Sequence, residues 1–298
     1  MSVQLLSSEK PSRPRSAILS GLAPIWEKLS REPVGLCGFL VLFVLVLVAV
    51  FAPLIAPYDP AVQNLQAAFQ PPSFSHLVGT DEFGRDIFSR LVYGARITLS
   101  TIFSVTLIVG PIGLFVGVVS GFVGGRTDAI LMRLTDIVLS FPSLILALAF
   151  AAALGAGLGT AVIAISLTSW PPIARLARAE AMIVRNTDYV AAARLYGASP
   201  MRLLMLYIAP MCIPSVVVRL TLNMAGIILT AASLGFLGLG AQPPAPEWGA
   251  MISSGRKFML DHWWIAVMPG VAILISSLAF NLVGDTLRDL LDPRHARS

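Results

Sequence analysis

Between two long apolar segments, residues 187–210 read TDYVAAARLYGASPMRLLMLYIAP and form a basic, soluble-looking island. Asp188 is a favourable residue for a helix N-cap, and helix formers follow it as far as Gly197, which suits the left-handed position that ends a helix. Ser199 then offers a second N-cap, and Pro200 fits the first helical position because the N–H that proline lacks is not needed there. The stretch therefore predicts a short helix of about two turns, a corner and a second, longer helix.

The composition rules out a soluble globular protein. The 298 residues are 56% hydrophobic and 12% charged, which is too few charges to cover a soluble surface of this size. The net charge of +5 is compatible with nucleic acid, but the basic residues cluster in the gaps between apolar runs, so membrane topology accounts for them and we expect no nucleic-acid partner. Cys37 and Cys212 lie in apolar runs without a second ligand at metal spacing, so we expect packing residues.

The apolar runs predict an all-α membrane protein with six transmembrane helices and both termini in the cytoplasm. The first run is longer than the core of a signal peptide, so we expect a retained span. We expect a cytoplasmic tail over 1–33, the first span over 34–56, an external connection over 57–96, a five-helix core over 97–284 and a cytoplasmic tail over 285–298.

The expected spans of the core are 97–125, 134–154, 161–174, 203–234 and 265–283. A short cytoplasmic turn joins the first two. Phe141-Pro142 predicts a kink in the third expected span, and Trp170-Pro171 interrupts the fourth. Arginines concentrate in the loop over 175–202, which the positive-inside rule places in the cytoplasm.

Glycines recur at a spacing of four residues in the second expected span, at Gly113, Gly117, Gly121 and Gly125. Residues at this spacing share one side of a helix, where small side chains let another helix approach closely. We therefore favour helix packing over the alternative of a gating hinge at Pro111.

Arg219 is the single charge in the fifth expected span. An arginine inside a bilayer is costly and normally faces a partner or a water-filled path. Two hypotheses stay open: Arg219 faces a translocation path, or it pairs with a neighbouring subunit.

Charges of both signs alternate in the external connection, at Asp81, Glu82, Arg85, Asp86 and Arg90. Carboxylates beside arginines can form an acid/base or metal site. The alternation of signs favours mutual pairing on an external loop instead.

Four segments resemble permeases of ABC importers for dipeptides, oligopeptides and nickel, and the resemblance covers roughly residues 30 to 294. They are HLVGTDEFGRDIFSRLVYGAR at 76–96, the loop at 187–210, SLGFLGLGAQPPAPEWGAM at 233–251 and GDTLRDLLDPR at 284–294. The loop is similar to the family signature of Glu-Ala-Ala, three residues, Gly and an Ile-x-Pro-like ending. The matching positions are Ala191, Ala192, Ala193, Gly197, Ile208 and Pro210. Ala191 stands where the family usually has Glu, and we expect its loss to remove a capping box with Asp188.

The resemblance implies a type I ABC importer permease in the bacterial inner membrane, moving di- or oligopeptides, with nickel, glutathione or another small solute as alternative cargo. It implies a second homologous permease, two ATPase subunits that hold ATP and Mg²⁺, an external solute-binding protein and the surrounding lipid as partners. The implied ATPase-coupling residues are Asp188, Ala191, Ala192, Ala193, Arg194, Gly197, Ala198, Ser199, Pro200, Ile208 and Pro210.

We expect no enzymatic activity and no bound cofactor in this chain. Its three lysines, Lys10, Lys28 and Lys257, do not stand in a phosphate-binding Gly-x-x-x-x-Gly-Lys-Ser/Thr loop. An intramembrane hydrolase needs a nucleophile and a base, or metal ligands, within the spans, whereas the three histidines lie in loops or the tail. A stand-alone channel or secondary transporter is the other alternative, although an ion-coupled transporter is expected to carry carboxylates deep in the membrane.

Overall fold

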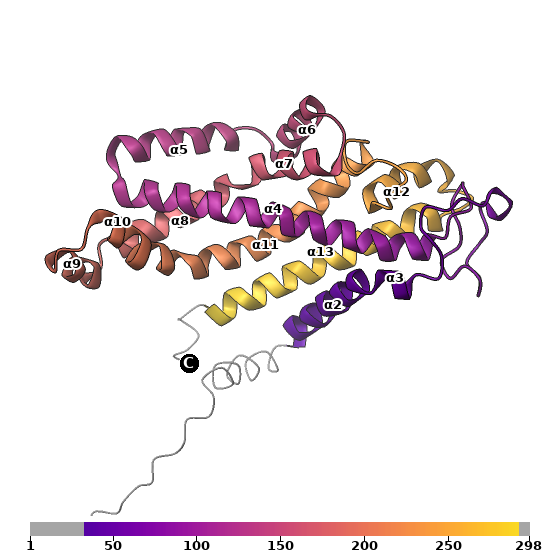
Figure 1. The fold of residues 1–298 in the computed structure, drawn as a ribbon, viewed down its shortest axis with the longest axis horizontal. Coiled ribbons are helices and arrows are strands. Elements are labelled where there is room, and N and C mark those ends of the chain that lie inside the picture. The colour runs from indigo at the N-terminus through magenta and orange to yellow at the C-terminus, as the bar shows by residue number, and fades with distance from the viewer. Residues whose placement is uncertain (1–32, 292–298) are drawn as a thin grey trace, which may run out of the picture.

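The computed structural model describes residues 33–291, and this part of the chain consists of helices and loops without a named strand. Figure 1 shows an elongated bundle in which α4, α11 and α13 run along the long axis. The helices are α2 (Pro33–Val50), α3 (Ala52–Ile55), α4 (Ile87–Val123), α5 (Gly125–Leu139), α6 (Ser143–Leu154), α7 (Leu158–Ser169), α8 (Pro171–Val184), α9 (Asp188–Leu195), α10 (Pro200–Arg202), α11 (Ala209–Phe236), α12 (Trp248–Gly255) and α13 (Trp264–Leu291). Short 3₁₀ turns cover Leu65–Ala67 and Arg256–Phe258, and a π-helical segment, η2, covers Leu203–Ile208.

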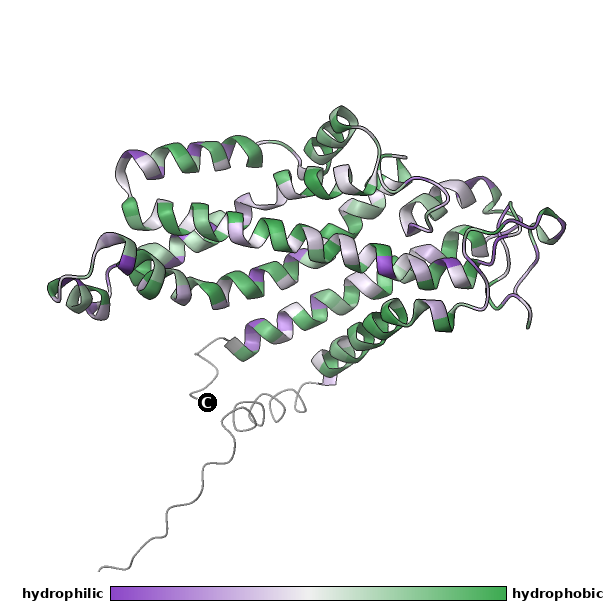
Figure 2. Ribbon diagram, viewed as in Figure 1, coloured by the Kyte–Doolittle hydropathy of each residue, from purple (hydrophilic) through white to green (hydrophobic). Residues whose placement is uncertain are grey.

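The two ends of the bundle differ in character. The loop before α4 gathers with α12 at one end, and α9 and α10 lie at the opposite end (Figure 1). Figure 2 shows α2 as almost uniformly hydrophobic and the loop before α4 as largely hydrophilic. The expected tail over 1–33 lies outside the described residues except for Pro33, as do residues 292–298 of the expected C-terminal tail.

Four helices of the described residues are long and apolar enough to cross a membrane: Pro33–Val50, Ile87–Val123, Pro200–Phe236 and Trp264–Leu290. A fifth span results if α5 and α6, which meet at an angle of 89°, count as one broken span. The break falls at the predicted Phe141-Pro142 kink. The count of six spans and the cytoplasmic position of both termini stay predictions.

The expected fourth span is divided at Trp170 into α7 and α8. α7 has 12 residues and is about 18 Å long, whereas the hydrocarbon core of a bilayer is about 30 Å thick, so α7 alone does not cross it. Pro171 and Pro172 lack the N–H groups that would continue the hydrogen bonds of α7, and they occupy the first positions of α8 instead.

Several other expected boundaries are wrong. The first span is divided at Phe51, and α4 begins at Ile87 rather than at residue 97, because the Asp86 carboxylate caps it by accepting a hydrogen bond from the Ser89 N–H at 2.8 Å. The expected cytoplasmic turn before residue 134 is the first part of α5, and residues 285–291 continue α13.

Of the charges expected to pair in the external connection, Asp81, Arg85 and Arg90 do pair, and they are buried rather than exposed on a loop. Glu82 is half-buried and makes no ion pair within residues 33–291. Arg85 Nε donates to Asp81 Oδ2 at 2.6 Å, and the Arg90 guanidinium lies 3.7 Å from the same carboxylate. His76 Nδ1 lies 2.9 Å from Asp86 Oδ1, a contact that the charge pattern did not predict. These side chains fix the loop before α4 to the end of the bundle.

The glycine stripe of α4 faces α8. A Cβ added to Gly113 would lie 2.7 Å from Ile173 Cγ2, one on Gly117 would lie 2.3 Å from the Ala174 carbonyl oxygen, and one on Gly121 would lie 2.6 Å from the Arg178 carbonyl oxygen. Real Cβ atoms essentially never approach so closely, so α4 packs against the Ile173 side chain at Gly113 and against the backbone of α8 at Gly117 and Gly121. Gly125 is not part of this stripe, because α4 ends at Val123 and Gly125 begins α5.

Candidate functional site

The short helix and corner predicted at residues 187–200 are present. α9 ends in a Schellman motif, in which the Gly197 N–H donates to the Arg194 carbonyl at 3.0 Å and the Ala198 N–H donates to the Ala193 carbonyl at 3.1 Å. Gly197 has φ of +82°, the left-handed conformation expected from the sequence. Ser199 Oγ then accepts a bond from the Arg202 N–H at 3.4 Å and caps α10.

The N-cap of α9 is Thr187 and not Asp188 as expected. The Thr187 hydroxyl donates to the Val184 carbonyl at 2.7 Å, and Asp188 occupies the first helical position, where its negative charge suits the helix dipole. Ala191 is then the fourth helical residue. A capping box uses the third, so the expectation that Ala191 removes such a contact was wrong.

α9 is anchored on one side to η2, the segment that leads into α11. The side chains of Val190 and Ala193 are 0% and 8% exposed, and the Tyr189 hydroxyl donates to the Tyr207 carbonyl in η2. Ile208, at the end of η2, is fully buried. A π-helical turn is uncommon and often marks a functional position, and here it receives the helix that projects from the bundle.

The rest of this corner is uncovered and combines apolar and basic side chains. Leu195 is 90% exposed and Tyr196 is 93% exposed, and Arg194 and Arg202 are exposed beside them. Figure 1 places α9 at the extreme end of the bundle. Of the expected coupling residues, Ala193 and Ile208 are buried, Ala198 is half-buried, and Asp188, Ala191, Ala192, Arg194, Gly197, Ser199, Pro200 and Pro210 are exposed. An exposed apolar patch with a polar rim is typical of a protein-docking surface.

The expected loop over 175–202 is shorter in the structure, because residues 175–184 belong to α8. Arg178 forms a two-pronged bond with Asp128 of α5, with Nε–Oδ1 at 2.6 Å and Nη2–Oδ2 at 2.7 Å. Arg185, directly after α8, donates to the Gly121 carbonyl at 2.7 Å and so caps the end of α4. The loop that carries α9 is therefore tied to α4.

Two further polar contacts join α8 to its neighbours. Arg175 Nη2 lies 2.5 Å from Asp136 Oδ1 on α5, and the Ser215 hydroxyl on α11 donates to Glu180 at 2.9 Å. Sequence reasoning treated these charges only as topology signals. The opposite charges of the two segments were visible in the sequence and could have suggested ion pairs. Which charges pair depends on how α8 packs, and the sequence does not specify that packing.

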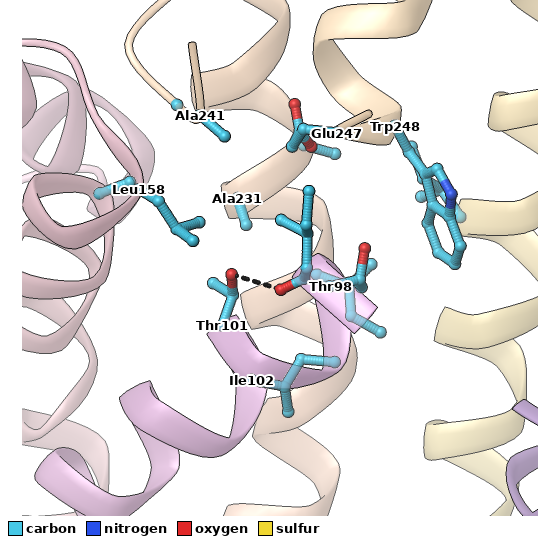
Figure 3. Close-up of a pocket in the computed structure, with 14 residues that line it drawn as sticks. Thr98, Thr101, Ile102, Leu158, Ala231, Ala241, Glu247 and Trp248 are labelled. Carbon is cyan, nitrogen blue, oxygen red and sulfur yellow. Dashed lines mark hydrogen bonds between the residues drawn. The ribbon is translucent and has the colours of Figure 1, made fainter. Parts of the chain in front are cut away.

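A small cavity lies between α4, α7, α11, α12 and α13, at the end of the bundle that carries α12 (Figure 3). Its volume of about 20 Å³ suits a single water molecule, whereas small-molecule sites have several hundred Å³. Glu247 lies at its edge, and its carboxylate caps α12 by accepting bonds from the N–H groups of Gly249 and Ala250 at 2.8 and 2.7 Å. Burial nevertheless raises the pKa of Glu247 above its usual value. This cavity is not a substrate pocket in the present conformation.

Arg219 lies on α11 with an exposed side chain, and the structure does not bring it together with the corner at α9. No group of three or more metal-ligating side chains gathers within residues 33–291.

Helices long and apolar enough to cross a membrane, a polar loop at one end and an exposed basic corner at the other define the class of a multi-pass membrane protein. The family described as binding-protein-dependent transport system inner membrane component matches residues 113–297, and the N-terminal TM domain of oligopeptide transport permease C matches residues 22–72. The chain belongs to this family of inner-membrane transport components, and it is an ABC importer permease.

Curated relatives match the chain over nearly its whole length. The chain is 44% identical over 275 residues to a probable D,D-dipeptide transport system permease protein of Escherichia coli (strain K12), covering 92% of each protein. It is 44% identical over 289 residues to a di/tripeptide transport system permease protein of Pseudomonas aeruginosa (strain UCBPP-PA14), covering 95% of each.

A solved structure shares the fold. An inward-facing form of the MetNI methionine ABC transporter matches with a TM-score of 0.56 and 22% identity, covering 69% of this chain and 98% of that chain. The predicted family, permease fold and multi-pass inner-membrane location are thus confirmed. An ABC importer permease implies ATPase and binding-protein partners.

Proposed function

We propose that this chain imports di- or oligopeptides as one of two homologous permeases of an ATP-driven importer. The support is the near-complete match to relatives that are named as dipeptide and di/tripeptide permeases. An external solute-binding protein delivers the peptide, and each permease contributes half of the path through the membrane. Import of nickel, glutathione or another small solute is the alternative within the same class. A stand-alone channel or secondary transporter is the alternative outside it.

The uncovered corner at α9 is the proposed docking surface for an ATPase subunit, and the observation that carries this proposal is its combination of exposure and rigidity. Leu195 and Tyr196 are almost fully exposed, while the Schellman motif and the buried Val190 fix the backbone beneath them. Apolar and aromatic side chains of this kind anchor protein interfaces. Arg194 and Arg202 supply the charged rim.

Coupling follows from where α9 is attached. The Tyr189 hydroxyl bonds to η2, directly before α11, and the Arg185 guanidinium bonds to the end of α4. A displacement of α9 by the ATPase therefore moves α4 and α11 together. ATP and Mg²⁺ belong to the ATPase subunits, and this chain binds no cofactor. The nucleotide drives transport because the ATPases, and through them the permeases, favour different conformations with and without it.

Two measurements test the proposal. Affinity purification of the tagged chain from its native membrane, with mass spectrometry, is expected to recover a second permease and ATPase subunits in stoichiometric amounts. The purified assembly with its binding protein, in liposomes, is expected to accumulate a labelled dipeptide only with ATP. Recovery of the chain alone supports a stand-alone transporter. ATP-driven uptake of another solute, without peptide uptake, supports a different cargo.

A further inference from the structure

Arg219 lies at a depth where the membrane is apolar. The continuous helix Pro200–Phe236 has 37 residues, and its midpoint falls at residue 218. Such a helix is about 55 Å long, against a hydrocarbon core of about 30 Å, so its midpoint lies within the apolar depth. A charged side chain at this depth requires a charged partner or water.

Arg219 has no partner within residues 33–291. Its side chain is exposed, and the ion pairs of this part of the chain involve other arginines, namely Arg85, Arg90, Arg175 and Arg178. Glu180, the carboxylate that α8 presents to α11, is bonded to the Ser215 hydroxyl instead. The guanidinium therefore points away from this chain's own core.

Polar and small residues continue from Arg219 along one side of α11. They recur after four, three, four and three residues, which keeps them on one helical face over about four turns. We call this face the polar stripe, and its members are Arg219, Asn223, Gly226, Thr230 and Ser233. Arg219 and Gly226 are exposed, and the other three are half-buried. Thr230 and Ser233 donate to the carbonyls one turn earlier, at 2.9 and 2.7 Å, so they need no fixed partner on another helix.

The opposite side of α11 is mainly apolar, as a lipid-facing surface is, and on this side the Thr221 hydroxyl donates to the Val217 carbonyl at 3.0 Å. Val217 is two residues from Arg219, so its side chain points about 160° away. It is 42% exposed and lines a groove between α4 and α11 with Phe103, Leu107, Ile213 and Leu220, where the one polar side chain is Thr106. One exposed side of α11 therefore suits water or a polar solute, and the other suits lipid.

We propose that the polar stripe lines the translocation path and that Arg219 binds the C-terminal carboxylate of a passing peptide. This inference rests on the proposed peptide import. A carboxylate is the group that every linear peptide carries whatever its sequence. The guanidinium fork matches its two oxygens, and a partly dehydrated path strengthens the contact. Asn223, one turn away, is half-buried, and its side-chain Nδ2 has no hydrogen-bond partner within the described residues.

The first experiment tests the location of the stripe without any substrate. The complete importer, with Cys37 and Cys212 changed to Ser, carries Asn223→Cys, Thr230→Cys or Val217→Cys and is placed in liposomes under ATP turnover. Membrane-impermeant methanethiosulfonates on both sides are expected to modify positions 223 and 230. They are expected to leave position 217, the matched control on the same helix, unmodified. Equal protection of all three positions overturns the proposal.

The second experiment tests the charge of the path. At Asn223→Cys, an anionic methanethiosulfonate is expected to react about tenfold faster than a cationic one, because Arg219 lies one turn away. In the Arg219→Gln background this preference is expected to disappear, and in Arg219→Lys it is expected to persist. A preference unchanged by Arg219→Gln overturns the proposal. Loss of the second permease on purification of Arg219→Gln also overturns it and assigns Arg219 to a subunit contact.

The third experiment tests the ligand. Uptake of a labelled dipeptide and uptake of its C-terminal amide are each measured for wild type and for Arg219→Gln. Both importers use the same binding protein, so selection by that protein cancels when each substrate is compared between the two importers. Arg219→Gln is expected to lower uptake of the free carboxylate about tenfold and that of the amide less than twofold. Equal losses overturn carboxylate binding. Absence of peptide uptake by wild type contradicts the proposed function and leaves the labelling result standing.

Discussion

A Cβ on Gly117 would lie 2.3 Å from the carbonyl oxygen of Ala174, so α4 and α8 are in contact backbone to backbone at this point. A carbonyl oxygen within a helix cannot move aside as the end of a side chain can. The contact therefore allows glycine and no other residue without separating the two helices.

Gly117→Ala is expected to lower the thermal stability of the detergent-solubilised importer, at a cost of about 1–3 kcal/mol from overpacking. Gly270→Ala is the matched control, because Gly270 lies within α13 and a Cβ there meets nothing within 4 Å. That variant is expected to be neutral or slightly stabilising, since alanine favours a helix over glycine. Equal melting temperatures of the two variants contradict the close contact.

The fork between Arg178 and Asp128 is expected to hold α5 against α8. In a double-mutant cycle with Arg178→Ala and Asp128→Ala, measured by chemical unfolding, we expect a coupling of about 1–3 kcal/mol because both bonds involve charged groups. The comparison cycle uses Arg175 and Asp136, whose side chains are about half exposed. We expect a smaller coupling there. If the coupling energy of Arg178 and Asp128 is no larger than that of Arg175 and Asp136, the fork does not hold α5 against α8.

Gly197→Leu is expected to reduce ATP-dependent uptake without affecting membrane insertion. The cost comes from the backbone, because φ is +82° while a Cβ at Gly197 meets nothing within 4 Å. Gly197→Asn is the control, since asparagine tolerates this conformation better than other residues, and uptake is expected to stay near wild type. Normal uptake by the leucine variant shows that the corner does not need its present shape.

Tyr189→Phe removes the hydroxyl that bonds α9 to the Tyr207 carbonyl. A hydrogen bond contributes about 1 kcal/mol, so amide hydrogen exchange within α9 is expected to accelerate about fivefold. Tyr196→Phe is the matched control at the other end of α9, where the side chain is 93% exposed. If both variants exchange at the same rate, the hydroxyl does not anchor α9.

The sequence predicted the corner after α9 well because its signals are local. Gly197 and Ser199 act on backbone groups only a few residues away, so residue type and position suffice. The N-cap was misplaced by one residue because Thr187 and Asp188 are both acceptable caps, and only the backbone conformation distinguishes them. The start of α4 was missed because the charges around Asp86 look solvent-exposed, whereas folding buries Asp81, Arg85 and Arg90 against one another.

Long-range contacts were beyond sequence reasoning for a different reason. The four-residue glycine spacing identified a packing face but not α8 as the helix that lies on it. Similarly, Arg178, Arg185 and Glu180 each bond to a segment that is far away in the chain, and only the packed arrangement selects these partners. The polar stripe on α11 is visible in the printed sequence, yet its exposure is a property of the fold.

The bond from Arg185 to the Gly121 carbonyl has a mechanical consequence. Arg185 holds the segment before α9 to the end of α4, and Tyr189 holds α9 itself to η2. These two bonds attach α9 rigidly to the bundle. A flexible attachment would bend when α9 moves, and part of the displacement of α9 would not reach the rest of the bundle. If an ATPase subunit displaces α9, as proposed, a rigid attachment carries that displacement to the end of α4 and the start of α11 at the same time.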